Sequence, residues 1–277
     1  MLQSNAEELN SLQSKLIYTR KILSHFSYCW QKKRGRDMIT VDQLCYQVVK
    51  GSKGQEGFAL KNISFVLEKG YIMGVLGKNG SGKSSLLRLL YGMERSDSGS
   101  VFWEGQDIHS DLCAFRQKTA YIASDSGFFH YRSLEENVEL LGYLYDHFDR
   151  NHLNQYLEQY GLETKMDSLY GMLSTGEQRK FQLAFAMAHQ PELLILDELT
   201  ANLDSVFRTE LMEVLQDLVA KEETSVILST HILSDIDEIV DYIAILKAGE
   251  LVLFGDRESI TEQQGSMELE DLFLSVI

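Results

Sequence analysis

The chain has 277 residues, of which 44% are hydrophobic and 24% charged, a balance typical of a globular protein with a sizeable buried core. Its net charge of −15 is uneven, since residues 1–37 carry +4 and residues 38–277 carry −19. Such an acidic body disfavours a nucleic-acid partner bound through a broad basic face, and no apolar run is long enough to span a bilayer. The three cysteines are scattered without metal-ligand spacing, which favours reduced thiols in a cytosol.

Residues 1–37 differ in character from the rest of the chain. Apolar side chains recur at helical spacing from Leu16 to Trp30, and the basic run 32–36 follows them. Three interpretations stay open: an amphipathic helix on an anionic membrane, a partner-facing or poorly ordered arm, or a translated ribosome-binding site ahead of a true start at Met38. We therefore treat residues 1–37 as an N-terminal arm and expect the folded domain to span residues 38–277.

From Met38 onward, β-rich alternating segments and amphipathic segments follow one another. We expect strands over 39–49, 61–67, 71–76, 101–103, 119–123, 193–196 and 225–228, and two closing strands after them. We expect helices over 83–91, 205–221 and 232–241. This alternation predicts an α/β sheet with helices on its faces.

A helical block interrupts this alternation. Ser133 with Glu136, and Ser174 with Glu177, form capping-box patterns that mark two helix starts. We expect the stretch from the first start to about residue 170 to be helical, and a helix from the second start to about residue 190. The chain is therefore predicted to carry an inserted helical subdomain over about residues 125–190.

Residues 77–84 match the phosphate-loop pattern G-x-x-x-x-G-K-[ST], directly after the expected strand 71–76 and at the start of an expected helix. Glycines let backbone N–H groups approach phosphate oxygens closely, and the helix N-terminus offers its positive end to the same anion. Lys83 is expected to reach the β- and γ-phosphates, and the Ser84 hydroxyl to bind Mg²⁺. The predicted ATP-binding residues of this segment are Gly77, Lys78, Asn79, Gly80, Ser81, Gly82, Lys83, Ser84 and Ser85.

A second candidate group stands at the end of the apolar strand 193–196, where Asp197 and Glu198 follow one another. An ATPase needs a carboxylate near the Mg²⁺ bound by Ser84, and Asp197 at a strand end can supply it. It also needs a group that orients or deprotonates the attacking water, which is the role predicted for Glu198. Adjacent residues of a strand point to opposite faces, so the chain must turn immediately after Asp197 if both acids serve one site.

Further motifs surround this acid pair in a set order. Residues 173–177 read LSTGE before it, and residues 201–204 (ANLD) and 229–231 (STH) follow it. Together with the phosphate loop, this set resembles the ATP-binding cassette (ABC) transporter family over about residues 38–255. The LSTGE segment is similar to the family's signature motif LSGGQ, and Asp204 is similar to its D-loop aspartate.

The resemblance implies a P-loop NTPase (RecA-like) α/β core with an antiparallel β subdomain and an inserted α-helical subdomain. It implies an ATPase with ATP and Mg²⁺ as ligands, in which Glu198, His231 and Lys83 act on the γ-phosphate and the attacking water. Cassettes of this family dimerise head to tail, so Ser174 and Gly176 would act on the ATP held by the partner. The pattern at Ser174 is equally that of an ordinary helix cap.

Three positions depart from the family pattern. Ser124 stands where the family carries a glutamine that contacts Mg²⁺, and either Asp125 or a water molecule would have to replace that contact. The aromatic residue that stacks on adenine is missing from its usual place, which leaves Tyr46 or Phe58 as candidates. Leu199 replaces the usual proline after the catalytic glutamate.

The aromatic-rich segment 128–149 and the segment 229–235 resemble exporter-type ATPases that pair with ABC-2-type permeases, many of which serve drug, peptide or antibiotic export. The same aromatics would also suit the core of the helical subdomain. The resemblance implies a separate permease chain and a second cassette as partners, at the cytoplasmic face of the cell membrane, with residues 128–131 lining the groove for the permease. The alternative is a soluble single-cassette ABC ATPase of a cytosolic assembly, such as an iron–sulfur cluster scaffold.

Overall fold

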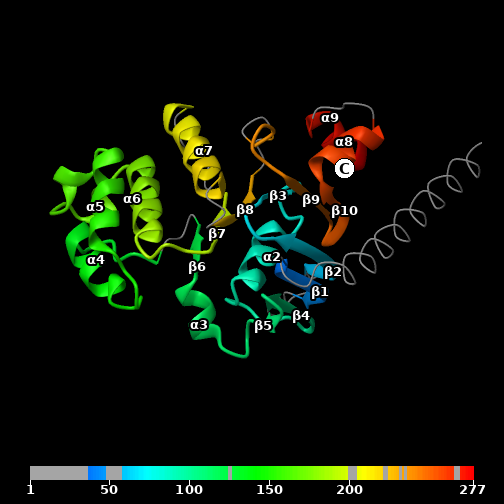
Figure 1. The fold of residues 1–277 in the computed structure, drawn as a ribbon, viewed down its shortest axis with the longest axis horizontal. Coiled ribbons are helices and arrows are strands. Elements are labelled where there is room, and N and C mark those ends of the chain that lie inside the picture. The colour runs from blue at the N-terminus through cyan, green and yellow to red at the C-terminus, as the bar shows by residue number, and fades with distance from the viewer. Residues whose placement is uncertain are drawn as a thin grey trace, which may run out of the picture. The chain divides into compact units, whose positions relative to one another are not determined.

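The computed structural model describes residues 37–47, 58–123, 127–198, 205–220, 224–230, 233, 236–264 and 269–277. Residues Met38–Ile277 form one compact unit, shown in Figure 1. The expectations for the arm lie outside the described residues and stay predictions.

A four-stranded sheet contains the first strands of the chain. Its order is β2-β1-β4-β5, formed by Ala59–Glu68, Asp37–Gln47, Ser98–Trp103 and Gln106–Asp107. β1 and β4 pair antiparallel, and so do β4 and β5. Buried side chains alternate with more exposed ones along β2, as expected for a sheet with one face on the core. This sheet is the antiparallel β subdomain that the family resemblance implies.

A six-stranded sheet forms the centre of the unit, in the order β10-β9-β3-β8-β7-β6. These strands are Glu250–Asp256, Tyr242–Lys247, Ile72–Leu76, Ser225–Ser229, Leu193–Asp197 and Thr119–Ile122. All neighbours pair parallel except β9 and β10, which pair antiparallel. Every residue of β3, β7 and β8 is buried, which is why these strands read as continuous apolar runs. The predicted α/β sheet is thus confirmed.

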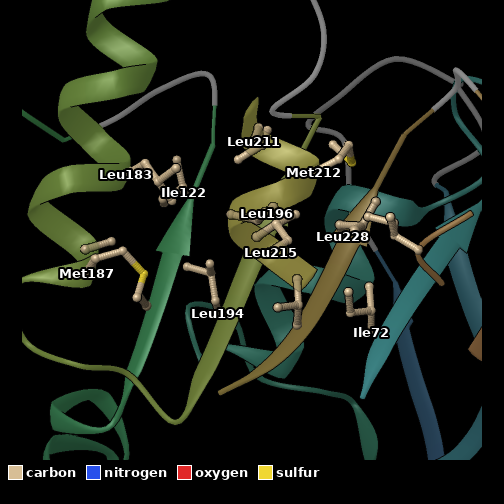
Figure 2. Close-up of a cluster of buried hydrophobic side chains, with 14 of the residues drawn as sticks. Ile72, Ile122, Leu183, Met187, Leu194, Leu196, Leu211, Met212, Leu215 and Leu228 are labelled. Carbon is tan, nitrogen blue, oxygen red and sulfur yellow. The ribbon is translucent and has the colours of Figure 1, made fainter. Parts of the chain in front are cut away.

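Alternate residues of the central strands supply two hydrophobic clusters on opposite faces of this sheet. Leu194, Leu196 and Leu228 belong to one cluster, which α7 (Ser205–Ala220) and α6 (Thr175–Met187) cover (Figure 2). Leu193, Ile195 and Ile227 belong to the other, which contains α2 (Lys83–Leu90) and the four-stranded sheet. The central strands are therefore packed on both faces, which fixes the positions of the residues at their ends.

The helical block lies beside β6, where α6 contacts that strand (Figure 1). Both predicted capping boxes are present: Ser133 caps α4 (Leu134–Gly142) with Glu136, and Ser174 caps α6 with Glu177. An aromatic cluster fills the block, with Phe128 stacked on Tyr170 at 5.2 Å between ring centroids. Phe128, Tyr145 and Phe148 of the aromatic segment therefore pack against the core of this block, whereas Phe129 and Tyr131 are exposed.

The stretch from Ser133 to about residue 170, expected to be helical, contains separate helices. The chain leaves α4 at Gly142 and starts a new helix, α5 (Arg150–Gln159), because the Asp149 carboxylate accepts from the backbone N–H groups of Asn151 and His152. Two short 3₁₀ turns, Glu163–Lys165 and Tyr170–Met172, then lead to α6. The aspartate cap was the missed signal in the sequence.

Of the helix expected over residues 232–241, the structure describes residues 233 and 236–241. Residue 233 is in a 3₁₀ turn and residues 236–239 form a turn, after which the Val240 N–H donates to the Ile236 carbonyl oxygen, so the described part holds helical turns but no regular α-helix. Ile236 and Val240 pack directly over Gly74 of β3, and the Asp241 carboxylate accepts from the Ile72 N–H at 2.8 Å.

Four elements were not predicted: β5, α3 (Leu112–Gln117), α8 (Arg257–Gln264) and α9 (Leu269–Val276). The sequence marks two of the missed helix starts, because Asp111 caps α3 and the Asp256 carboxylate accepts from the Ser259 N–H at the start of α8. None of the helices in the described part of the chain combines the length and the apolarity that a bilayer crossing requires.

Candidate functional site

The candidate site lies at the carboxyl ends of the central parallel strands. In the sheet register, Ser229 at the end of β8 pairs with Asp197 at the end of β7 and with Val75 near the end of β3. The loop after β3 is the phosphate loop. The sheet therefore brings the loop, the acid pair and Ser229 to one edge, which is where open α/β sheets bind ligands.

The glycines of the phosphate loop adopt backbone conformations that residues with a side chain rarely adopt. Gly82 has φ +109°, and a Cβ there would lie 2.3 Å from Cζ of Phe58. A Cβ on Gly77 would lie 2.3 Å from Oγ of Ser81. The Ser81 hydroxyl is buried and has no hydrogen-bond partner among the described residues. An unpartnered hydroxyl inside a loop that is closed to side chains fits a phosphate ligand, which supplies acceptor oxygens.

Lys83 is the buried cation of the site. It is only 4% exposed, and its Nζ donates to the Gly77 carbonyl oxygen at 2.8 Å. The Nζ also lies 3.8 Å from Oε1 of Glu198. Burial lowers the pKa of Lys83, while the negative charges of Glu198 and Asp197 act in the opposite direction. The ammonium group is thus held over the loop, where a phosphate would exchange for the contact with Gly77.

Asp197 collects three hydroxyl groups at the end of β7. Its Oδ1 accepts from Oγ of Ser84 at 3.0 Å and from Oγ of Ser229 at 2.8 Å. Its Oδ2 accepts from the hydroxyl of Tyr121 at 3.0 Å. The pair of Ser84 and Asp197 was predicted from the sequence, and the structure brings these side chains into contact. A hydroxyl beside a carboxylate is a donor set of hard oxygens, which fits Mg²⁺.

Sequence reasoning missed Tyr121, and it placed Ser229 in the STH motif without its contacts to the acid pair. Tyr121 pairs with Ile195 in the register of β6 and β7, which places it on the same sheet face as Asp197, two residues farther along β7. Burial, and after it the charge of Asp197, raises the pKa of Tyr121, so its hydroxyl keeps its proton and acts as a donor. The signal was present in the strand alternation, but using it required the strand order.

Glu198 follows Asp197 in a left-handed backbone conformation, with φ +52°. Its N–H donates to Oγ of Ser229 at 3.0 Å and approaches the Ser229 carbonyl oxygen at 3.2 Å. The turn that the sequence required after Asp197 is therefore present. It leaves the Glu198 side chain 38% exposed beside Lys83, where a water molecule can reach it.

The LSTGE segment lies at the start of α6. The Ser174 hydroxyl caps the helix, and all its hydrogen bonds in the described part of the chain stay within α6. Lys165 donates to the carboxylate of Glu177, which lowers the pKa of Glu177 to about 2. A Cβ added to Gly176 would meet nothing within 4 Å, so this face of the helix start is open.

The remaining predicted residues divide into two groups. His231, Ser124, Asp125, Leu199 and Asp204 lie outside the described residues, and their roles stay predictions. The two candidates for the adenine contact are described. A hydrogen bond to Glu94 is the main cause that raises the pKa of Tyr46, so this hydroxyl is engaged elsewhere, whereas the ring of Phe58 lies against Gly82 of the phosphate loop.

The family model described as "ABC transporter" matches residues 60–201, just over half of the chain. The chain belongs to the ABC transporter family. It is an ATP-binding ATPase cassette of that family, and the phosphate loop described above is its Walker A motif.

Several curated relatives and solved structures are similar to this ABC ATPase. It is 32% identical over 218 residues to the ABC transporter ATP-binding protein YtrB of Bacillus subtilis. This alignment covers 78% of this chain and 73% of the relative. It is 30% identical to the methionine import protein MetN of Protochlamydia amoebophila, over 80% of this chain and 67% of the relative. It is 29% identical to the bacitracin transport protein BcrA of Bacillus licheniformis, over 70% of this chain and 63% of the relative.

A solved structure of an ATP-binding subunit of an ABC transporter superposes on this cassette with a TM-score of 0.76 at 25% identity. The superposition covers 86% of this chain and 99% of the solved chain. The P-loop NTPase fold predicted from the sequence is confirmed.

Proposed function

We propose that this ATPase hydrolyses ATP at the edge formed by β3, β7 and β8, with Glu198 acting on the attacking water. The observation that carries the proposal is the contact of Ser84 with Asp197 at 3.0 Å, next to Lys83 at 3.8 Å from Glu198. Lys83 and the loop N–H groups would hold the phosphates. Glu198 would accept a proton from water, because its carboxylate is partly exposed and fixed by the turn at Ser229.

Mg²⁺ would be held by Ser84 and Asp197, where it supplies positive charge that neutralises the phosphates as charge develops on them. The chain's own residues do the remaining work. Ser229 fixes both acids at once, since its hydroxyl donates to Asp197 and its oxygen accepts from the N–H of Glu198. Phe58, beside Gly82, is the side chain that we propose stacks on the adenine.

We further propose that two cassettes complete each site. The start of α6 is open at Gly176, and a helix N-terminus capped by a serine is suited to an anion. The resemblance to LSGGQ supports placing Ser174 and Gly176 against the γ-phosphate held by a partner cassette. His231 would brace the same phosphate from within the chain.

The phosphate site is tested by Lys83→Ala, with Lys118→Ala as a matched control. Lys118 lies on the surface and pairs with Glu192, away from the loop. Lys83→Ala should weaken ATP binding at least about tenfold, because a charge-assisted contact to phosphate is lost. Lys118→Ala should bind ATP like the parent. Calorimetry measures both affinities, and an unchanged affinity in Lys83→Ala would refute the assignment.

For the transport partner, we propose a separate permease of the ABC-2 type that works in export. A pocket of about 190 Å³ separates β6 from the helical block, and its wall includes Gly127 and Phe128. Phe129 and Tyr131 lie in the adjacent turn with 49% and 91% of their surface exposed. The similarity to a bacitracin transport protein supports export, whereas the similarity to a methionine import protein supports the opposite direction. The aromatic sequence segment decides our choice.

The permease proposal has a direct test at the cytoplasmic face of the membrane. The ATPase rate should rise when the chain is reconstituted in vesicles with an ABC-2-type permease encoded beside it. Tyr131→Ala should reduce this stimulation and keep the basal rate. A rate that no adjacent permease changes would favour the alternative, a single-cassette ATPase of a soluble assembly.

A further inference from the structure

The two oxygens of the Asp197 carboxylate are held by different elements. Oδ1 accepts from Ser84 of the phosphate loop and from Ser229 of β8. Oδ2 accepts from Tyr121 of β6. Asp197 is only 7% exposed, so a missing hydrogen bond at Oδ2 would not be replaced freely by bulk water. The rotation of this carboxylate about its own axis therefore depends on Tyr121.

Tyr121 is itself held firmly enough to serve as a fixed donor. Its backbone belongs to β6, in register with Ile195 of β7. Its ring stacks on Tyr91 with centroids 5.4 Å apart and planes at 29°, and Tyr91 in turn hydrogen-bonds through its hydroxyl to Tyr145. The stacked ring of Tyr91 thus restricts the swing of the Tyr121 ring and keeps its hydroxyl beside Asp197.

We propose that Tyr121 is a positioning residue of the ATPase site, which holds the Asp197 carboxylate so that Oδ1 stays directed at Ser84. The inference rests on the proposed role of Ser84 and Asp197 in binding Mg²⁺. Partners that orient a metal-binding group from behind commonly change metal affinity by one order of magnitude or more when they are removed. Tyr121 would act through Asp197 alone, because its hydroxyl bonds to the carboxylate and not to the phosphate loop.

The test uses Tyr121→Phe, which removes the hydroxyl and keeps the ring. Mn²⁺ serves as a probe of the metal site, and its binding to the ADP-saturated chain is measured by electron paramagnetic resonance. We expect Tyr121→Phe to weaken Mn²⁺ binding about tenfold. ATP binding in EDTA should stay within about twofold of the parent, because the phosphate loop is untouched. If Tyr121 had only a structural role, Mn²⁺ binding and ATP binding would weaken together.

The matched control is Tyr91→Phe, which removes a buried hydroxyl from the ring stacked on Tyr121. This control should bind Mn²⁺ like the parent, and its melting temperature reports the cost of a lost hydroxyl in this cluster. A second readout is the Mg²⁺ concentration that gives half-maximal ATPase activity. That concentration should rise about tenfold in Tyr121→Phe, while the rate at saturating Mg²⁺ changes much less.

Asp197→Ala separates the inference from the function on which it rests. If this variant loses Mn²⁺ binding while Tyr121→Phe binds Mn²⁺ as tightly as the parent, the role of Tyr121 is refuted and the metal site stands. If Asp197→Ala keeps full Mn²⁺ affinity, the proposed metal site is refuted, and the role of Tyr121 with it. An equal weakening of Mn²⁺ binding in Tyr91→Phe would show that packing, and not the hydroxyl at Oδ2, matters.

Discussion

Glu198 combines a reactive position with an unfavourable backbone. Its φ of +52° is uncommon for a residue with a side chain, and such conformations persist only where the surroundings impose them. Here Ser229 imposes it, since both its hydroxyl and its carbonyl oxygen lie within 3.2 Å of the Glu198 N–H. The turn lets two consecutive acids face one site, one directed at Ser84 and one at Lys83.

His189 gives a pH-dependent prediction at the same scale. It is 4% exposed, and burial lowers its pKa from 6.5 to about 4. Between these two values the unfolded chain binds a proton that the folded chain does not, so stability falls as the pH falls through this window. Between pH 6.5 and pH 4.5, the free energy of unfolding should fall in both chains. We expect the fall to be about 2 kcal/mol smaller in His189→Gln than in the parent.

The measurement is chemical denaturation of both chains at the two pH values. The exposed His147 supplies the control, and His147→Gln should follow the parent. A parallel pH dependence in His189→Gln and the parent would show that His189 is charged in the folded chain or does not titrate there.

Motif residues could be predicted from the sequence, but their helpers could not. The phosphate loop is one short segment, and Asp197 and Glu198 are neighbours in another. The spacing of residues within each segment is therefore enough to reveal it. Tyr121 and Ser229 come from different strands, and only the pairing of β6, β7 and β8 brings them to Asp197.

At the scale of elements, α4 and α6 begin in the same way. In each helix a serine hydroxyl accepts from the N–H of a glutamate three residues on, and that carboxylate accepts from the serine N–H. The two starts differ in their proposed roles, since only Ser174 belongs to the LSTGE segment. This pair therefore separates the cost of losing a cap from the cost of losing a contact to phosphate.

We predict that Ser133→Ala and Ser174→Ala each lower the free energy of unfolding by about 1 kcal/mol, because each removes one helix cap. The ATPase rate should fall at least about tenfold in Ser174→Ala, which also loses a donor to the γ-phosphate. It should stay within about twofold in Ser133→Ala. Thermal melts and steady-state ATPase rates check both statements, and equal rates in the two variants would mean that Ser174 is a cap only.

Elements with strong local signals were predicted, and elements fixed by distant contacts were not. The buried strands β3 and β7 and the capped helices have continuous apolar runs or capping boxes in the sequence. The segment 236–241 carries an apolar helical pattern, and its described residues form a turn in which Ile236 and Val240 pack on Gly74, a strand residue far away in the chain. A pattern cannot report such a contact before the topology is known.

At the scale of the whole molecule, the net negative charge contrasts with the positive groups at the phosphate loop. The body from residue 38 carries −19, yet its phosphate loop brings Lys83 and the start of α2 together at one sheet edge. Local donors at close range therefore outweigh the overall charge for a phosphate ligand, because salt screens charges that are more than about 10 Å apart.

The boundary at Met38 gives a prediction for the whole chain. A chain that begins at Met38 should bind ATP and melt within about 3 °C of the full-length protein, because all the buried residues that the structure describes in the two core clusters lie from Met38 onward. As a control, a chain that begins at Ala59 lacks β1 and its buried residues, and it should fail to fold. A loss of many degrees on removing residues 1–37 would show that the arm packs on the body.

The central claim is that Glu198 completes an ATP-hydrolysing site, and the ATPase rate of Glu198→Gln tests it most directly. Glu250→Gln is the control, because Glu250 pairs with Lys61 on the surface and is 57% exposed. Glu198→Gln should still bind ATP but turn it over at least about 100-fold more slowly, since the amide cannot accept a proton from water. Glu250→Gln should match the parent. A near-normal rate in Glu198→Gln, at unchanged ATP affinity, would contradict the account.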